Sequence, residues 1–201
     1  DGQLVDNTSF TLTVNPVNDA PEIISEISVS TDEDNSIEIT LDGIDIDGDV
    51  LTYLIDEESL NGEVVIIDNI ATFSPDLNYN GITSFSYKAF DGELASNSSA
   101  VEIIVTPVND APVLDAIADQ EVDEDNTFTY SLSADDVDGD VLTYTASVDG
   151  NGSVSIDGSE LTIIPDTNFN GDILVEVNVS DGQVLDSTSF TLTVVPVNDA
   201  P

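Results

Sequence analysis

Carboxylate side chains gather in short acidic stretches that recur along the chain. DEDN occurs at 32–35 and again at 123–126, and DIDGDVLTY at 45–53 returns as DVDGDVLTY at 136–144. Oxygen ligands from several short loops suit a hard cation, and Ca²⁺ takes about six to eight of them. Zinc and copper sites are disfavoured because the chain has no His and no Cys. The acidic stretches therefore predict calcium binding.

Two familiar calcium loops do not fit these stretches. In DIDGDVLTY, Gly48 stands at the fourth position, whereas an EF-hand needs its glycine at the sixth and a helix on each side. The glycine-rich nonapeptides of a calcium-binding β-roll are also missing. A plain turn remains the alternative reading of DxDGD, because Asp and Gly favour turns for local hydrogen-bonding and φ > 0 reasons.

The charge balance excludes several classes of partner. Forty-two acidic residues face a single basic one, Lys88, so the formal net charge is −41 over 201 residues. Nucleic acids and anionic membrane surfaces require Lys and Arg, so neither is expected as a partner. No apolar run approaches the roughly 18 residues of a membrane span, and no direct membrane insertion is expected. The self-repulsion of such a chain calls for salt or bound cations.

Paired carboxylates also hydrolyse glycosides, so an enzyme is a second class to weigh. Here the carboxylates recur at each repeat, whereas a catalytic site would usually occur once in the chain. With no His, no Cys and one Lys, few other acid–base groups are present. We therefore expect no catalytic activity.

A repeat of about 90 residues sets the domain organisation. PVNDAP occurs at 16–21, 107–112 and 196–201, and a period this long indicates whole domains rather than solenoid turns. The first 21 residues match 181–201 almost letter for letter. We expect residues 1–21 to be the tail of a preceding repeat, followed by repeats at 22–112 and 113–201. The opening residues show no signal peptide, and we expect the chain to be part of a longer protein.

Apolar residues alternate with polar ones throughout each repeat. Phe85, Tyr87 and Ala89, for example, alternate with Ser86 and Lys88, as a half-buried strand requires. No segment has the spacing of an amphipathic helix. The alternation predicts strands near 37–41, 50–55, 63–67, 70–74, 83–90 and 100–106, with one more before 32. We expect an all-β protein of tandem antiparallel Greek-key sandwiches with about seven strands each.

The order of the motifs resembles the cadherin repeat. An early Glu33-Asp34-Asn35 is followed by Asp45-Ile46-Asp47, then by Asp91-Gly92, and finally by the PVNDAP linker. The VNDAP and PDxNYNG variants resemble the bacterial cadherin-like repeats of very large surface and secreted adhesins. The resemblance implies sandwiches joined end to end, Ca²⁺ at each boundary, and an extracellular or cell-surface location.

Carried over residue by residue, the resemblance implies a set of calcium ligands at each linker. Around linker 107–112 they are Glu33, Asn109, Asp110, the carbonyl of Ala111, Asp136, Asp138 and Asp181. Around linker 16–21 they are Asn18, Asp19, Asp45, Asp47 and Asp91, and at the C-terminal linker they are Glu124, Asn198 and Asp199.

Two departures from cadherins predict fewer or weaker calcium sites. The linker begins with Pro107 where cadherins have Asp, and the mid-domain LDRE motif is missing. PDLNYNG and PDTNFNG fall near that motif, which makes Asp76 and Asp166 candidate replacements and Asn78 and Asn168 weaker ones. Their Asn-Gly pairs also suit a purely structural turn. We expect affinities toward the 10⁻⁴–10⁻³ M typical of extracellular modules, as an order of magnitude.

Two functions fit this reading. The first is a calcium-stiffened spacer in a cell-surface or secreted adhesin, whose partners are the neighbouring repeats of the same chain. The second is a binding module that contacts a partner cell, a glycan or a sister chain through a sandwich face. Repetition extends length without needing distinct sites, so the near-identity of 1–21 and 181–201 favours the spacer.

Overall fold

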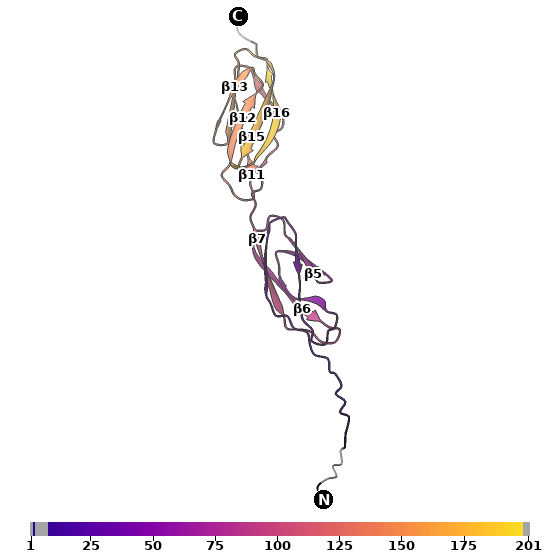
Figure 1. Ribbon diagram of the computed structural model, residues 1–201. Helices are drawn as coiled ribbons and strands as arrows, with labels where there is room; N and C mark the ends of the chain where they lie inside the picture. The colour runs from indigo at the N-terminus through magenta and orange to yellow at the C-terminus, as the bar shows by residue number, and fades with distance from the viewer. Residues whose placement is uncertain (1, 3–7, 199–201) are drawn as a thin grey trace. The chain divides into compact units, whose positions relative to one another are not determined.

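The computed structural model describes residue 2 and residues 8–198, which fall into two compact units, 1–107 and 108–201. Each unit is a β-sandwich and is described by itself (Figure 1). The described residues include no helix long and apolar enough to cross a membrane. The repeat boundaries at 22–112 and 113–201 stay a prediction from the sequence period.

Unit 1 contains two sheets that share one core. Its seven strands, among the described residues, are β1 (Ile27–Asp32), β2 (Ile37–Thr40), β3 (Thr52–Ser59), β4 (Gly62–Ile67), β5 (Ile70–Pro75), β6 (Gly81–Phe90) and β7 (Ser99–Thr106). One sheet has the order β1-β7-β6-β3 and the other has the order β2-β5-β4. Consecutive strands β2 and β3 thus lie in different sheets, and the loop between them crosses one end of the sandwich.

Unit 2 repeats this arrangement and adds a short strand pair. Its strands are β8 (Val113–Leu114), β9 (Gln120–Asp123), β10 (Phe128–Ser131), β11 (Ala134–Asp135), β12 (Thr143–Val148), β13 (Gly152–Asp157), β14 (Glu160–Pro165), β15 (Gly171–Ser180) and β16 (Leu185–Val195). The sheets have the orders β12-β15-β16-β9 and β10-β14-β13, with β11-β8 beside them. In unit 1 the counterpart of that pair is a single bridge between Glu22 and Ile44.

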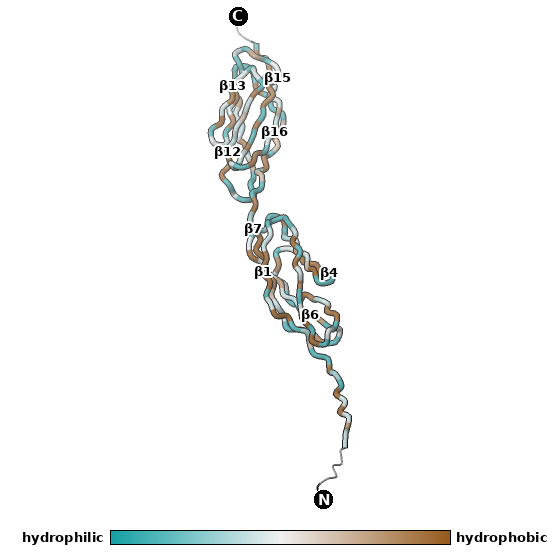
Figure 2. Tube along the Cα trace, in the orientation of Figure 1, coloured by the Kyte–Doolittle hydropathy of each residue, from teal (hydrophilic) through white to brown (hydrophobic). Residues whose placement is uncertain are grey.

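Alternating burial confirms the expected all-β sandwiches. In β6, Phe85, Tyr87 and Ala89 face the core, and Tyr87 is 0% exposed. In β15, Val175 and Val177 do the same. Figure 2 shows hydrophilic and hydrophobic residues interleaved along the chain in each unit. The strands expected for unit 1 all occur, with their ends moved by at most a few residues.

One strand pair in each unit differs from the antiparallel expectation. β1 pairs with β7 in parallel, with Ile27 opposite Val101, and β9 pairs with β16 in parallel. The cause lies in the DEDN turn that follows the first strand, where Asp34 has φ of 59°. This turn carries the chain to the other sheet, so the first strand is left beside the last strand of its own sheet. Alternation reports which side chains face inward but not the direction of a strand.

Candidate metal centre

The DxDGD loop of unit 1 is wrapped around one carboxylate. Asp45 Oδ1 accepts the backbone N–H of Asp47 at 2.9 Å, of Gly48 at 2.9 Å and of Asp49 at 3.2 Å. Gly48 has φ of 83°, which a glycine adopts without strain. The loop therefore needs Asp45 for its shape and Gly48 for its tight reversal.

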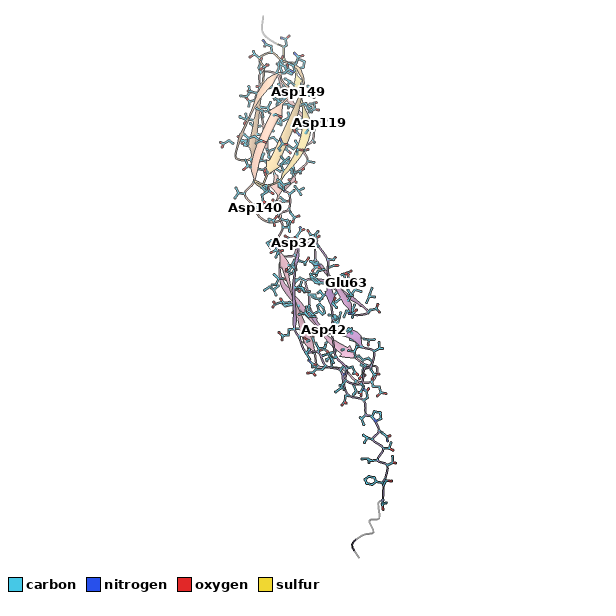
Figure 3. The ribbon with its side chains drawn as sticks, in the orientation of Figure 1. Asp32, Asp42, Glu63, Asp119, Asp140 and Asp149 are labelled. Atoms are coloured by element: carbon cyan, nitrogen blue, oxygen red, sulfur yellow. The ribbon has the colours of Figure 1, made fainter. Side chains whose placement is uncertain are left out.

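Three carboxylates converge in each DxDGD loop. Asp45, Asp47 and Asp49 offer oxygens that all lie within 4.8 Å of one another. In unit 2, Asp136, Asp138 and Asp140 do the same, and Figure 3 shows Asp140 at the end of unit 2 where the linker enters. Oxygens that bind one Ca²⁺ at about 2.3–2.6 Å can lie no more than about 5 Å apart, so this spacing fits shared coordination. Without a cation, unit charges 4 Å apart repel by about 1 kcal/mol even in bulk water.

One carboxylate oxygen in each loop is buried and lacks a donor. Asp45 Oδ2 and Asp136 Oδ2 have no hydrogen-bond partner in the part of the chain that the structure describes. A buried acceptor without a donor is costly, and a buried unpaired negative charge is more so. A cation would satisfy these oxygens, and an all-oxygen donor set suits a hard one. The residues present therefore fit calcium.

The linkers dock on these loops through backbone hydrogen bonds. The N–H of Asp19 donates to Asp47 Oδ2 at 2.8 Å, and the N–H of Asp110 donates to Asp138 Oδ2 at 2.8 Å. Each unit thus brings together its predicted linker aspartate and the aspartates of its DxD motif.

The predicted ligand Asp91 already accepts three hydrogen bonds within unit 1. Its Oδ1 accepts the N–H of Glu93 at 2.6 Å and of Leu94 at 2.7 Å, and its Oδ2 accepts the amide of Asn18 at 2.9 Å. These donors, with the Leu94 N–H first, hold the pKa of Asp91 below its usual range. Asp91 therefore stays ionised and holds the linker, while its direct ligation of a metal stays a prediction.

Asp181 takes the same role in unit 2. Its Oδ2 accepts the amide of Asn109 at 2.7 Å, and its Oδ1 accepts the N–H of Gln183 at 2.6 Å and of Val184 at 2.7 Å. The Asn109 amide is the main reason that the pKa of Asp181 lies below its usual range. The two predicted residues Asn109 and Asp181 therefore contact each other directly.

The glutamate of each DEDN motif lies at the other end of its unit. Glu124 is 8% exposed, and its Oε1 accepts the N–H of Val197 at 2.6 Å. Glu33 is 2% exposed, and its own N–H donates to the carbonyl of Thr106 at 2.9 Å. Glu124 thus holds the start of the linker that follows its unit. Metal ligation by Glu33 and Glu124 stays a prediction.

The PDxNYNG motif supports the DEDN turn through Asn80, which was not predicted, and through the backbone of Asn78, which was the weaker predicted candidate. Asn80 Nδ2 donates to Glu33 Oε2 at 3.4 Å, and the N–H of Asn78 donates to Asp34 Oδ1 at 2.9 Å. Asp76 is exposed, and its backbone closes the turn by accepting the N–H of Tyr79 at 3.0 Å. This geometry favours the structural reading of the motif.

Unit 2 repeats these contacts, with Asn170 Nδ2 donating to Glu124 Oε2 at 3.5 Å and the N–H of Asn168 donating to Asp125 Oδ1 at 2.9 Å. Asp166 is exposed like its counterpart. Ligation by Asp76 and Asp166 stays a prediction.

The remaining predicted residues lie on the linkers. Ala111 and Asn198 are exposed, and Asp199 lies outside the described residues. Asp49 and Asp140 were missed as third carboxylates, although their spacing of four residues after Asp45 and Asp136 gave the signal. Nothing in the sequence indicated that Asn80 contacts Glu33, because Asn80 precedes a glycine and is explained as a turn residue.

A bacterial Ig domain family matches residues 18–104 and 109–195, which is most of the chain. No curated protein matches the sequence. Among solved structures, an endo-fucoidan hydrolase of glycoside hydrolase family 107 is 21% identical with a TM-score of 0.41, over 92% of this chain. The chain spans only 30% of that hydrolase.

Cadherin repeats match along nearly their full length. Repeats 1–2 of human protocadherin-24 are 18% identical with a TM-score of 0.60, covering 92% of this chain and 100% of that one. Repeats 1–2 of human mucin-like protocadherin are 17% identical with a TM-score of 0.50, covering 86% and 97%. These matches confirm the expected tandem cadherin-like fold. The chain belongs to the bacterial Ig domain family and contains two tandem copies of this domain.

Proposed function

We propose that each DxDGD loop binds Ca²⁺ together with the linker docked on it, and that this calcium stiffens a tandem-repeat spacer. The observation that carries the proposal is the buried, donor-free oxygen of Asp45 and of Asp136, each beside two further carboxylates. In unit 1 the ligands would be Asp45, Asp47 and Asp49. In unit 2 they would be Asp136, Asp138 and Asp140.

Calcium would supply positive charge at the point where the linker meets the following unit. Asp110 donates its N–H to Asp138, so a cation on Asp138 lies beside the linker backbone and can also take the Asp110 carboxylate. A bound ion removes the mutual repulsion of the carboxylates and opposes undocking of the linker. Without a bound ion, the loops carry uncompensated negative charge next to the linker.

A stiff passage between units requires the linker to be held at both of its ends. The C-terminal linker shows the hold on the preceding unit, since Val197 donates to Glu124, and linker 107–112 shows the hold on the following unit. Pro107 and Pro112 fix φ and limit the remaining freedom.

The same features support a place in a cell-surface or secreted adhesin. The family is a bacterial Ig domain, the copies are in tandem, and the fold is shared with cadherin repeats. The carboxylate clusters lie on exposed loops and recur in both units, which suits a structural ion rather than catalysis. An affinity of about 10⁻⁴–10⁻³ M would keep these loops loaded at extracellular calcium concentrations.

Single-molecule imaging of the end-to-end length tests the spacer. In saturating Ca²⁺ the length distribution should narrow, and NaCl at matched ionic strength should not reproduce this. Asp136→Ala combined with Asp138→Ala should abolish the effect of calcium at linker 107–112. A control, Asp157→Ala with Glu160→Ala, removes the same charge from an exposed hairpin and should stiffen like the parent.

Two results would count against the proposal. A chain that stays floppy in saturating Ca²⁺ contradicts the spacer. A double variant of Asp136 and Asp138 that is as stiff as the parent contradicts the assignment of the site.

A further inference from the structure

The two units differ at the residue that follows their Asp-Gly motif. Unit 1 has Glu93 after Asp91-Gly92, and unit 2 has Gln183 after Asp181-Gly182. In unit 2, Gln183 Nε2 donates to Asn109 Oδ1, so the Gln183 side chain binds the asparagine of the linker. An ionised glutamate has no donor and cannot make this bond.

The side-chain amide of Asn109 makes three hydrogen bonds within unit 2. Its Nδ2 donates to Asp181 Oδ2 at 2.7 Å and to the carbonyl of Asp110 at 2.9 Å, while its Oδ1 accepts from Gln183. A primary amide has two N–H donors and a carbonyl oxygen with two lone pairs, so both donors and one of the two lone pairs are used. The bond from Gln183 therefore fixes the side chain of Asn109 without any metal ion.

The linker in front of unit 1 has only half of this arrangement. Asn18 Nδ2 donates to Asp91 Oδ2 at 2.9 Å. Glu93 contributes its backbone N–H to Asp91 Oδ1 at 2.6 Å, but its side chain cannot donate to Asn18. Among the described residues, none donates to Asn18 Oδ1, which leaves that oxygen free for another ligand.

We propose that Asn109, Asp181 and Gln183 form a latch that docks linker 107–112 on unit 2 without metal, with Gln183 as the positioning residue. The latch uses neutral amide donors and one ionised acceptor, so it needs no cation to be complete. Linker 16–21 lacks the second clamp because Glu93 replaces glutamine. This inference goes beyond calcium binding and holds whether or not the DxDGD loops bind an ion.

Amide hydrogen exchange, followed by NMR on the full chain in excess EDTA, reads the latch directly. The reporter is the Asp110 N–H, which is protected only while the linker is docked on Asp138. Gln183→Ala and Gln183→Glu should each lower its protection by about fivefold, the effect of one ordinary hydrogen bond. Glu93→Gln should raise the protection of the Asp19 N–H by a similar factor, because it supplies the missing donor.

Matched controls separate the latch from a general loss of stability. Gln120→Ala removes a glutamine whose amide donates to the carbonyl of Ala118, and it should leave the protection of the Asp110 N–H unchanged. The amides of β15 and β16 should keep their protection in every variant, which shows that unit 2 remains folded. Unchanged Asp110 protection in Gln183→Ala would overturn the inference, as would protection in the parent that vanishes in EDTA.

The same samples then receive Ca²⁺, so that the two proposals can fail separately. If Gln183→Ala lowers the protection of the Asp110 N–H and the chain binds no calcium, the latch stands and the calcium-stiffened spacer is contradicted. If the chain binds calcium and the Asp110 N–H is equally protected in the parent and in Gln183→Ala, the latch is contradicted and the calcium proposal stands.

Discussion

The same acidic loop has different internal hydrogen bonds in the two units. In unit 1, Asp45 Oδ1 accepts three backbone N–H groups, whereas in unit 2 Asp136 Oδ1 accepts the N–H of Asp140 at 3.2 Å and Gly139 donates to the Asp136 carbonyl instead. Both loops nevertheless keep three converging carboxylates and one buried oxygen without a donor. The carboxylate set is thus kept although the hydrogen bonds within the turn differ, which favours ligation over a plain turn.

The cores differ in where their aromatic residues lie. In unit 1, Phe73, Phe85 and Tyr87 fill the centre from β5 and β6. In unit 2 the aromatic pair lies on β10 and β16, where the ring of the partly buried Phe128 lies 6.2 Å from that of Phe190, and the buried centre is otherwise aliphatic. Cores tolerate such exchanges when total volume is kept. The two units should therefore respond differently to mutation while they share one fold.

Removal of the central tyrosine should have the largest effect and should separate the units. Tyr87 is 0% exposed, so Tyr87→Ala should destabilise unit 1 by about 3–5 kcal/mol and leave unit 2 unchanged. Denaturant unfolding with a probe in each unit measures this. An equal loss in unit 2 would show that the cores are not independent.

Loss of one loop carboxylate should abolish calcium stabilisation in its own unit only. At calcium one hundred times the dissociation constant, a bound site adds about 2.7 kcal/mol to the free energy of unfolding. Asp45→Ala should remove this gain from unit 1, and Asp136→Ala should remove it from unit 2. Unfolding curves with and without Ca²⁺ check the result, and a gain that survives both substitutions would place the ions elsewhere.

Matching glycines in the hairpins before β4 and β13 should differ in their tolerance of a side chain. A Cβ on Gly62, whose φ is 151°, would lie 2.3 Å from the carbonyl oxygen of Ser74, whereas one on Gly152 would lie 2.9 Å from that of Ile164. Gly62→Ala should destabilise its unit by about 1–3 kcal/mol more than Gly152→Ala does. Similar losses in thermal melts would contradict the strained geometry at Gly62.

A pH difference between the units should be the smallest effect. The N–H groups of Leu114 and Ser187 hold the pKa of Asp186 below its usual range, while in unit 1 the neutral Asn97 accepts the matching N–H of Ile23 at 3.1 Å. A depressed folded-state pKa adds stability above the unfolded value, near 3.9, and that stability is lost as pH falls through the folded value.

Asp186→Asn should therefore lower the melting temperature of unit 2 slightly at pH 6, and this difference should shrink below about pH 4. Asn97→Ala in unit 1 is the comparison, and its effect should not change with pH over the same range. If Asp186→Asn lowered the melting temperature of unit 2 by the same amount from pH 6 to pH 3, the ionised Asp186 carboxylate would not be the source of this stability.

The sequence predicted the sandwiches well because alternation reports burial directly. Strands such as β6 alternate over ten residues, so their existence and inward faces could be predicted. β8 and β11 could not, because two residues carry no period. The parallel pairing of β1 with β7 was also hidden, since it depends on which sheet receives the chain after the DEDN turn.

The candidate site was predicted in part, for reasons that follow from hydrogen bonding. The aspartates of DxD and of the linker do lie together in each unit, as the ordered motifs indicated. The sequence could not show that Asn109 is occupied by Gln183, because that contact joins residues 74 positions apart. Nor could it show that Asn80, and not Asp76, contacts Glu33.

The most direct test of the central claim is isothermal titration of Ca²⁺ into the metal-stripped chain, with a thermal melt before and after. We predict saturable binding near 10⁻⁴–10⁻³ M, as an order of magnitude, and a marked rise in melting temperature. Asp45→Ala with Asp136→Ala should lose both. No binding heat and an unchanged melt would contradict the account, and would reduce the converging carboxylates to solvated turns in a plain tandem sandwich.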